Sequence, residues 1–323
     1  MIFVSVIPLL LYLLVLKSLD SFRIVHWRWL AICMAAGCGS CLVAWAFSEM
    51  SLALSLPFYA PLFEEVLKAL VALCVMRLFR IVFFAEALCY GAAIGAGFSL
   101  VENVIYLYFS PDMLFATALF RGLGTSMLHI GCTALFLVLW LLAKNNSRKP
   151  FFRFWGIIPC LLIHALHNLH YFQPLIQMVA VVVIFLVVFL CVSNYNEKCI
   201  GKWLDLSMMN DIDLLSAIKE GALPDTKAGE YLMSVKEQFD PYVFLDMICY
   251  VQLYLELTIT GKSRMMLRES GLLDEESEEE KAQYKAMLKE FDTLRGNIGK
   301  MGEIILRPIV KMTDEDKKLI GVD

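Results

Sequence analysis

The side chains of this chain that could do chemistry are ionisable or amide groups inside strongly apolar segments. They fall in four consecutive segments: Glu64, Glu65 and Lys68; Glu102 and Asn103; Arg121 and His129; and His164, His167 and Asn168. An ionisable group inside a membrane helix is costly, so it normally marks a functional site or a paired structural contact. This set is therefore the candidate site, with structural pairing between helices as the alternative explanation.

Helical spacing would bring these groups to one place. With a rise of about 1.5 Å per residue, four of them lie at a similar distance from the predicted outer ends of their helices: Glu64, Glu65, Glu102 and His164. His129 lies near mid-membrane. Matched depth on consecutive helices predicts one polar cavity that opens outward, and it makes purely structural pairing the less favoured explanation.

Adjacent Glu64 and Glu65 diverge by about 100° around a helix. Residues four apart share a face, as do Glu64 and Lys68, and His164 and Asn168. One glutamate is therefore expected to face the reacting centre, while the other is held by a nearby cation or amide. The groups available to hold it are Lys68, Arg121 and Asn103. Which glutamate has which role stays open.

Paired carboxylates and imidazoles are typical of enzymes that activate water. A buried carboxylate has a raised pKa unless a cation is near, which suits it as a general base. Imidazoles could stabilise an oxyanion or hold a metal ion. Catalytic Zn²⁺ sites commonly use His and Glu ligands and leave a position for water, so Glu65, His129 and His164 are sufficient to bind zinc. A metal-dependent and a glutamate-only mechanism both stay open.

Seven apolar stretches could position these groups as membrane helices. A bilayer core of about 30 Å needs about 20 mostly apolar helical residues. The stretches are roughly 1–16, 30–48, 57–76, 82–108, 113–143, 154–172 and 175–195. The first stretch has no basic residue before it, which favours a retained span over a signal peptide. The sequence thus predicts an all-α polytopic bundle of about seven transmembrane helices.

Basic residues occur in every second connector between these stretches. The basic connectors carry Lys17, Arg23 and Arg28; Arg77 and Arg80; Lys144, Arg148, Lys149 and Arg153; and Lys198 and Lys202. Because cytoplasmic loops collect Lys and Arg, we expect the N-terminus outside and the C-terminus in the cytoplasm. The expected location is a bacterial inner membrane.

Composition separates the chain into two parts. Of its 323 residues 59% are hydrophobic, and the mean hydropathy is +0.66, which is far too apolar for an ordinary soluble domain. Residues 1–203 carry 13 Lys+Arg and 8 Asp+Glu, whereas residues 204–323 carry 15 and 24. We therefore expect a transmembrane domain at 1–203 and a soluble helical cytoplasmic domain at 204–323. An eighth span at 241–260 is a less favoured alternative, because Asp246, Gln252 and Glu256 recur within it.

The polar groups also form recognisable motifs. Residues 64–68 are an EExxK, residues 98–103 are an FxxxEN, His129 follows, and residues 164–168 are an HxxxN. Their order resembles that of the PrsW-family intramembrane proteases. That family is similar in its core to the type II CAAX prenyl endopeptidases and to bacteriocin-processing membrane proteases. The resemblance covers roughly residues 55–172.

The resemblance implies cleavage of a peptide bond in a membrane-protein or peptide substrate, in or beside the bilayer. Glu64 and Glu65 would activate water, and His129 and His164 would complete the centre. Glu102 stands where the CAAX-processing branch carries a histidine, so prenylated substrates are not implied. The domain at 204–323 lies outside the resemblance and could bind a cytoplasmic partner or self-associate. No nucleic-acid partner is expected.

Two other functions would use the same groups. A proton-coupled transporter or channel also needs Glu and His inside the membrane, although the sequence has no visible inverted repeat of the kind many transporters carry. A non-catalytic scaffold could use the polar cluster to bind a partner helix.

Overall fold

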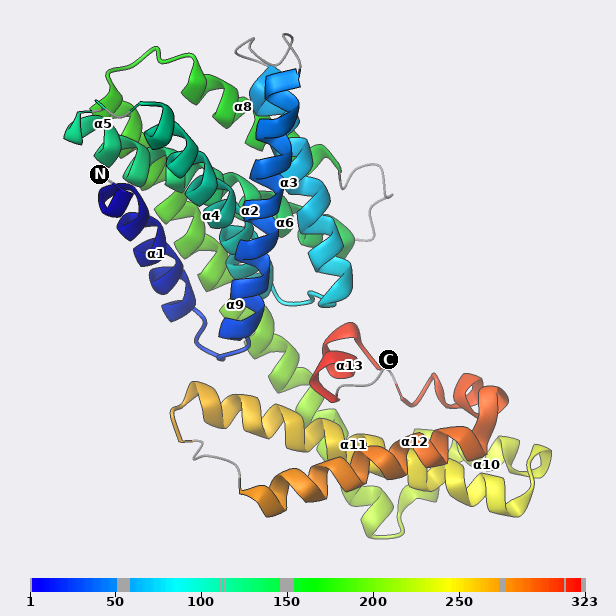
Figure 1. Cartoon of the computed structure of the whole chain (residues 1–323). Helices are drawn as coiled ribbons and strands as arrows, with labels where there is room; N and C mark the ends of the chain where they lie inside the picture. Colours follow the sequence, from blue (N-terminus) through cyan, green and yellow to red (C-terminus); the bar gives the residue numbers. More distant parts are fainter. Residues whose placement is uncertain are drawn as a thin grey trace. The chain divides into compact units, whose positions relative to one another are not determined.

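The computed structural model describes residues 2–50, 59–110, 112, 114–145, 154–272, 277–310 and 312–320. Within these ranges the regular structure is helical and no strand occurs, so the all-α prediction is confirmed (Figure 1). The chain divides into two compact units, residues 1–197 and residues 198–323. We refer to them as unit 1 and unit 2.

Unit 1 is built from long helices joined by short connections. Its helices are α1 (Ile2–Ser18), α2 (Trp27–Met50), α3 (Tyr59–Leu78), α4 (Phe84–Phe109), α5 (Phe115–Phe120), the π-helical turn η2 (Arg121–Thr125), α6 (Ser126–Asn145), the 3-10 turn η3 (Phe154–Gly156), α8 (Ile157–Asn168) and the first part of α9 (Pro174–Lys219). Every apolar stretch found in the sequence overlaps one of these helices. The first two residues of 57–76, residue 113, and the connector bearing Arg148, Lys149 and Arg153 lie outside the described residues.

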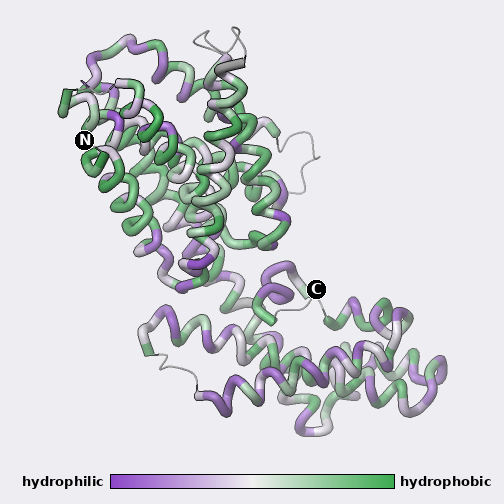
Figure 2. The backbone as a smooth tube through the Cα atoms, in the orientation of Figure 1, coloured by the Kyte–Doolittle hydropathy of each residue, from purple (hydrophilic) through white to green (hydrophobic). Residues whose placement is uncertain are grey.

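Among the described helices, five are long and apolar enough to cross a membrane. They are α2, α4, the continuous stretch Phe115–Lys144, α9 and α11 (Pro241–Glu269). The apolar helices α1 and Phe154–Asn168 are shorter, and α3 carries the charged residues of the EExxK motif and Arg77. Figure 2 shows that apolar residues dominate the helices of unit 1. The chain is therefore an all-α protein with several candidate membrane helices, and the count of seven stays a prediction.

Helix α4 forms the centre of unit 1. Its residues from Phe84 to Ser99 are buried without interruption, and it packs against α1, α2 and α6. Two glycines allow this close approach. A Cβ on Gly97 would overlap the backbone carbonyl of Met34 in α2, and a Cβ on Gly95 would overlap that of His129 in α6. The small residues of α4 thus fix the distance from α4 to the backbone that carries His129.

Unit 2 has its own apolar core. Besides the end of α9 it contains η4 (Leu223–Asp225), α10 (Lys227–Val235), η5 (Lys236–Gln238), α11, α12 (Glu278–Leu306) and α13 (Asp314–Ile320). Helix α11 begins at Pro241, a favoured residue for the first helical position. The preceding residue, Asp240, is the N-cap, and its side chain accepts a hydrogen bond from the Tyr242 amide. Helices α11 and α12 pack together around Met247, Tyr250 and Phe291. The sequence favours a soluble domain that includes residues 241–260. The solubility of unit 2 stays a prediction, because α11 has the length and composition of a membrane helix.

Candidate active site

Polar groups from four helices of unit 1 meet in one buried cluster. Helix α3 contributes Glu64, Glu65 and Lys68, α4 contributes Glu102 and Asn103, η2 and α6 contribute Arg121 and His129, and α8 contributes His164. These are eight of the nine residues that the sequence singled out as catalytic or supporting. The ninth, Asn168, ends α8, and among the described residues its side chain has no hydrogen bond to the others.

Glu65 and Lys68 form a buried ion pair within the cluster. The Lys68 Nζ atom lies 2.5 Å from Glu65 Oε1 and 2.9 Å from His129 Nδ1, and it sits over the Phe98 ring at 4.7 Å from the centroid. The same oxygen of Glu65 lies 2.8 Å from His164 Nδ1. Glu65 and Lys68 are 3% and 1% exposed, so each charge is compensated by its neighbour rather than by solvent.

These contacts orient both imidazole rings. Because the carboxylate of Glu65 accepts a hydrogen bond from His164 Nδ1, the Nε2 atom of His164 is left as an acceptor. That atom faces Glu64 Oε2 at 3.7 Å. The two rings are nearly perpendicular, with centroids 5.0 Å apart. A histidine held by a carboxylate through one nitrogen, with the other nitrogen free, is the usual arrangement of a metal-ligating histidine.

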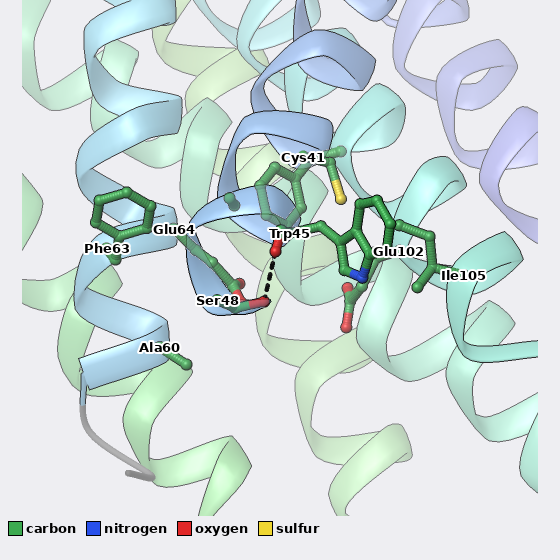
Figure 3. Close-up of a pocket in the computed structure, with 10 residues that line it drawn as sticks. Cys41, Trp45, Ser48, Ala60, Phe63, Glu64, Glu102 and Ile105 are labelled. Carbon is green, nitrogen blue, oxygen red and sulfur yellow. Dashed lines mark hydrogen bonds between the residues drawn. The ribbon is translucent and has the colours of Figure 1, made fainter. Parts of the chain in front are cut away.

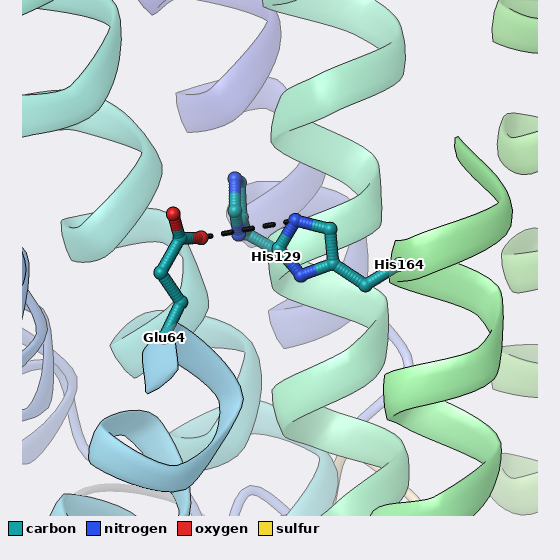
Figure 4. A group of neighbouring side chains, drawn as sticks. All are labelled: Glu64, His129 and His164. Atoms are coloured by element: carbon teal, nitrogen blue, oxygen red, sulfur yellow. Dashed lines mark ion pairs between the residues drawn. The ribbon is translucent and has the colours of Figure 1, made fainter. Parts of the chain in front are cut away.

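Glu64, His129 and His164 can supply one ligand atom each within 4.8 Å of one another (Figure 4). In a tetrahedral Zn²⁺ site with bonds of about 2.0–2.1 Å, ligand atoms lie about 3.3 Å apart, which is close to the distance between Glu64 and His164. The ligand set expected from the sequence had Glu65 in the place that Glu64 takes here. Two imidazoles and one carboxylate suit zinc and other divalent transition metals.

A second carboxylate, Glu102, lies on the other side of His129. Its Oε2 atom is 2.6 Å from His129 Nε2, but the angles are not those of a hydrogen bond, and neither buried atom has a hydrogen-bond partner among the described residues. Orphaned polar atoms of this kind are unusual in a folded interior. They fit a site that binds an ion or a substrate.

Arg121 and its neighbours hold Glu102 in place. The guanidinium lies 2.8 Å from Glu102 Oε1 and donates through Nε to Asn103 Oδ1 at 3.2 Å. The Asn103 amide in turn donates to Ser126 Oγ at 3.1 Å. Arg121 begins the π-helical turn η2, a local irregularity often found at functional sites. Ser126 was not identified from the sequence, because an isolated serine in an apolar segment carries no motif.

Two carboxylates of the cluster are accessible. The side chains of Glu64 and Glu102 are 22% and 30% exposed, whereas His129 and His164 are buried. Both carboxylates line a cavity of about 120 Å³ between α2, α3 and α4 (Figure 3). The other lining residues are Cys41, Ala44, Trp45, Ser48, Ala60, Phe63, Phe98 and Ile105. The sequence gave no indication that α2 takes part in the site.

The family assignment agrees with this geometry. The family model described as PrsW family intramembrane metalloprotease matches residues 25–192, a range that contains every residue of the cluster. No curated protein matches the chain, and no solved structure matches it. Membership favours hydrolysis over the transporter and scaffold alternatives. The chain belongs to the PrsW family of intramembrane metalloproteases.

Proposed function

We propose that this protein hydrolyses a peptide bond of a membrane-protein substrate at the group formed by Glu64, His129 and His164. The observation that carries the proposal is the convergence of these three ligand atoms within 4.8 Å, with His164 oriented by Glu65. Structural ion pairs alone would not need two imidazoles whose ring nitrogens face carboxylates. The proposal extends the family assignment to particular residues of this chain.

We assign Glu64, His129 and His164 as ligands of a divalent metal, with zinc as the metal. When bound there, zinc supplies a Lewis acid that polarises the scissile carbonyl and activates water. Glu65 acts as a positioning residue, because it is hydrogen-bonded to His164. Lys68 compensates the charge of Glu65, and it gives up its contact with His129 Nδ1 when that imidazole binds a metal, because an ammonium group can only donate. This assignment departs from the ligand set expected from the sequence, in which Glu65 was the carboxylate ligand.

Glu102 is the group that we assign as the proton acceptor. It is the other accessible carboxylate, it lies in the same cavity as Glu64, and Arg121 holds it through one oxygen only. The second oxygen faces His129 Nε2 at 2.6 Å but is not hydrogen-bonded to any of the described residues. Glu102 can therefore take a proton from the attacking water and return it to the leaving amine, as a general base and acid.

The charge pattern of the connectors supports one topology for unit 1. We propose that unit 1 crosses the membrane through seven helices, with the N-terminus outside and the C-terminus in the cytoplasm of a bacterium. The basic residues in alternate connectors support this orientation. The proposed domains are 1–203 and 204–323, and the second would bind a cytoplasmic partner or another copy of the chain. Family membership and the apolar helices support an integral membrane protein.

Three conservative variants separate the proposed roles. Metal content is measured by elemental analysis on purified full-length protein, and cleavage of membrane-spanning peptides is assayed on the same samples. Wild type is expected to hold one zinc per chain and to cleave. Glu64→Gln should lose both metal and cleavage, Glu102→Gln should keep metal and lose cleavage, and Glu65→Gln should bind metal about 10- to 100-fold more weakly.

The exposed Asp112→Asn variant is the matched control and should behave as wild type. Metal binding and cleavage that survive in Glu64→Gln would contradict the ligand assignment. Full cleavage by Glu102→Gln would contradict its role as proton acceptor. If Glu65→Gln loses all metal while Glu64→Gln keeps it, the ligand set first expected from the sequence is the right one.

A further inference from the structure

The cavity beside Glu64 and Glu102 has a buried apolar end. Phe98 and Cys41 are 1% and 3% exposed, and Ala44 is 8% exposed, so these residues form its inner wall. Trp45 and Ser48 of α2 are exposed and lie at its mouth. The Ser48 hydroxyl donates to the Trp45 carbonyl at 2.7 Å. The charged groups of the lining are the two glutamates (Figure 3).

The size of the cavity limits what can enter it. Its volume of about 120 Å³ is well below the roughly 300–1,000 Å³ of sites for drug-sized molecules. It is comparable to an engineered apolar cavity of about 150 Å³ that binds benzene. One side chain of the size of Leu, Met or Phe therefore matches this volume, whereas a Trp side chain or a folded segment exceeds it.

The position of the cavity places such an occupant next to the reacting groups. Glu64 is proposed to bind the metal and Glu102 to accept a proton, and both are in the cavity wall. The two histidines that we assign as metal ligands, His129 and His164, are buried. A peptide bond that reaches this cluster from the cavity side must bring an adjacent side chain against Ala44 and Phe98.

We propose that this cavity is the substrate-specificity pocket, and that it binds one Leu, Met or Phe side chain next to the scissile bond. The inference rests on the proposed function, since it takes Glu64 and Glu102 as the reacting groups. The selected substrate is an unwound membrane segment with a medium-sized apolar residue at one fixed position. In a hydrophobic enzyme pocket, each added or missing methylene changes specificity by roughly 10- to 200-fold.

The pocket can be filled from its inner wall. Ala44→Phe places a ring in the space assigned to the substrate side chain. Ala46→Phe is the matched control, because Ala46 is on the same helix, is exposed, and does not line the cavity. A membrane-spanning peptide that wild type cleaves is first mapped by mass spectrometry. Each residue flanking the cleaved bond is then replaced in turn by Gly, Ala, Leu, Phe, Trp or Lys.

At one flanking position, wild type should prefer Leu or Phe over Ala, Trp and Lys by at least tenfold. Ala44→Phe should reverse this preference at that position in favour of Gly and Ala, while Ala46→Phe should keep the wild-type profile. A wild-type enzyme indifferent to every flanking residue would overturn the proposal, and so would an unchanged profile in Ala44→Phe.

A binding measurement separates failure of the pocket from failure of the proposed function. A photoreactive p-benzoylphenylalanine at position 45 is crosslinked to the same peptides in the Glu102→Gln background. Crosslinking should be at least tenfold stronger with the Leu peptide than with the Lys peptide, and Ala44→Phe should remove the difference. Selective crosslinking without wild-type hydrolysis overturns the proposed function alone, whereas hydrolysis with unselective crosslinking overturns the pocket alone.

Discussion

Two buried lysines, one in each unit, have closely similar surroundings. Lys68 in unit 1 lies 2.5 Å from Glu65 and over the Phe98 ring. Lys262 in unit 2 is also fully buried, lies 2.7 Å from Asp211 and 3.3 Å from Asp316, and sits over the ring of Trp203 at 5.4 Å. Lys262 pairs with carboxylates of two other helices, whereas Lys68 pairs with a carboxylate of its own helix and reaches α6 through His129.

The difference lies in what surrounds the ion pairs. Lys68 contacts an imidazole, and its cluster continues to two accessible carboxylates and a cavity. Unit 2 contains none of the five histidines of the chain, and the carboxylates paired with Lys262 belong to α9 and α13, which it ties to α11. A buried ion pair is thus not in itself evidence of a catalytic site. The imidazoles and the access to the cluster distinguish the two.

The largest effect is expected when the structural lysine is removed. Lys262→Met leaves Asp211 and Asp316 without their shared cation, which costs about 3–5 kcal/mol and raises local opening by about 100- to 4,000-fold. Amide hydrogen exchange of full-length protein should show this loss of protection in α11 and α13. The exposed Lys317→Met variant of α13 is the control. A change of less than tenfold for Lys262→Met would mean that the ion pairs do not hold these helices.

The equivalent change in unit 1 should affect metal binding. Lys68→Met removes the cation that compensates Glu65, so the carboxylate that orients His164 is left buried without a partner charge. Loss of a residue that supports the metal ligands without touching the metal typically costs about 10- to 100-fold in metal affinity or activity. Zinc titration should show this loss for Lys68→Met, whereas Lys262→Met should keep the affinity of wild type. Equal loss in both variants would show that the two lysines do not differ in role.

Part of the site could be predicted because its signals are local in the sequence. An ionisable residue in an apolar segment stands out because burying it in a membrane costs free energy. The constant rise of a helix then predicts how deep in the membrane each of these residues lies. Which of Glu64 and Glu65 belongs to the group that could hold a metal could not be predicted in this way. It depends on the rotation of α3 about its axis, which is set by packing against α2, α4, α6 and α8 rather than by the EExxK spacing.

The apolar half of the site was missed for a related reason. Cys41, Ala44 and Trp45 have the composition of any membrane helix, so only the packing of α2 against α4 identifies them as a cavity wall. In unit 2, Lys262 was missed because its partners are far away in sequence, at positions 211 and 316. Sequence spacing predicts contacts within a helix, whereas contacts between helices depend on packing.

A smaller effect is expected where the backbones of α4 and α6 meet. Gly95→Ala introduces a Cβ that would overlap the carbonyl of His129, so α6 must shift and His129 with it. Overpacking of this kind costs about 1–3 kcal/mol, and we expect zinc affinity to fall about tenfold. Gly39→Ala in α2 is the control, because open space surrounds that position. Unchanged affinity in Gly95→Ala would show that α6 can move without displacing the ligand.

The smallest effect is expected at the far end of the hydrogen-bond network. Ser126 Oγ accepts from Asn103 at 3.1 Å and from Ser99 at 2.9 Å, and Asn103 accepts from Arg121. Ser126→Ala leaves the Asn103 amide poorly satisfied at a cost of about 1 kcal/mol. The Asn103 side chain can then rotate and lose its hydrogen bond to Arg121, so Arg121 holds Glu102 less firmly.

Because Ser126 contacts neither the proposed ligands nor the cavity, its loss should lower kcat about fivefold and leave zinc affinity and KM unchanged. Ser40→Ala is the control, since the Ser40 hydroxyl donates only to Gly37 within its own helix. A loss of zinc affinity equal to the loss of kcat would place Ser126 in support of the metal ligands. An unaltered kcat would mean that Arg121 holds Glu102 without help from Asn103.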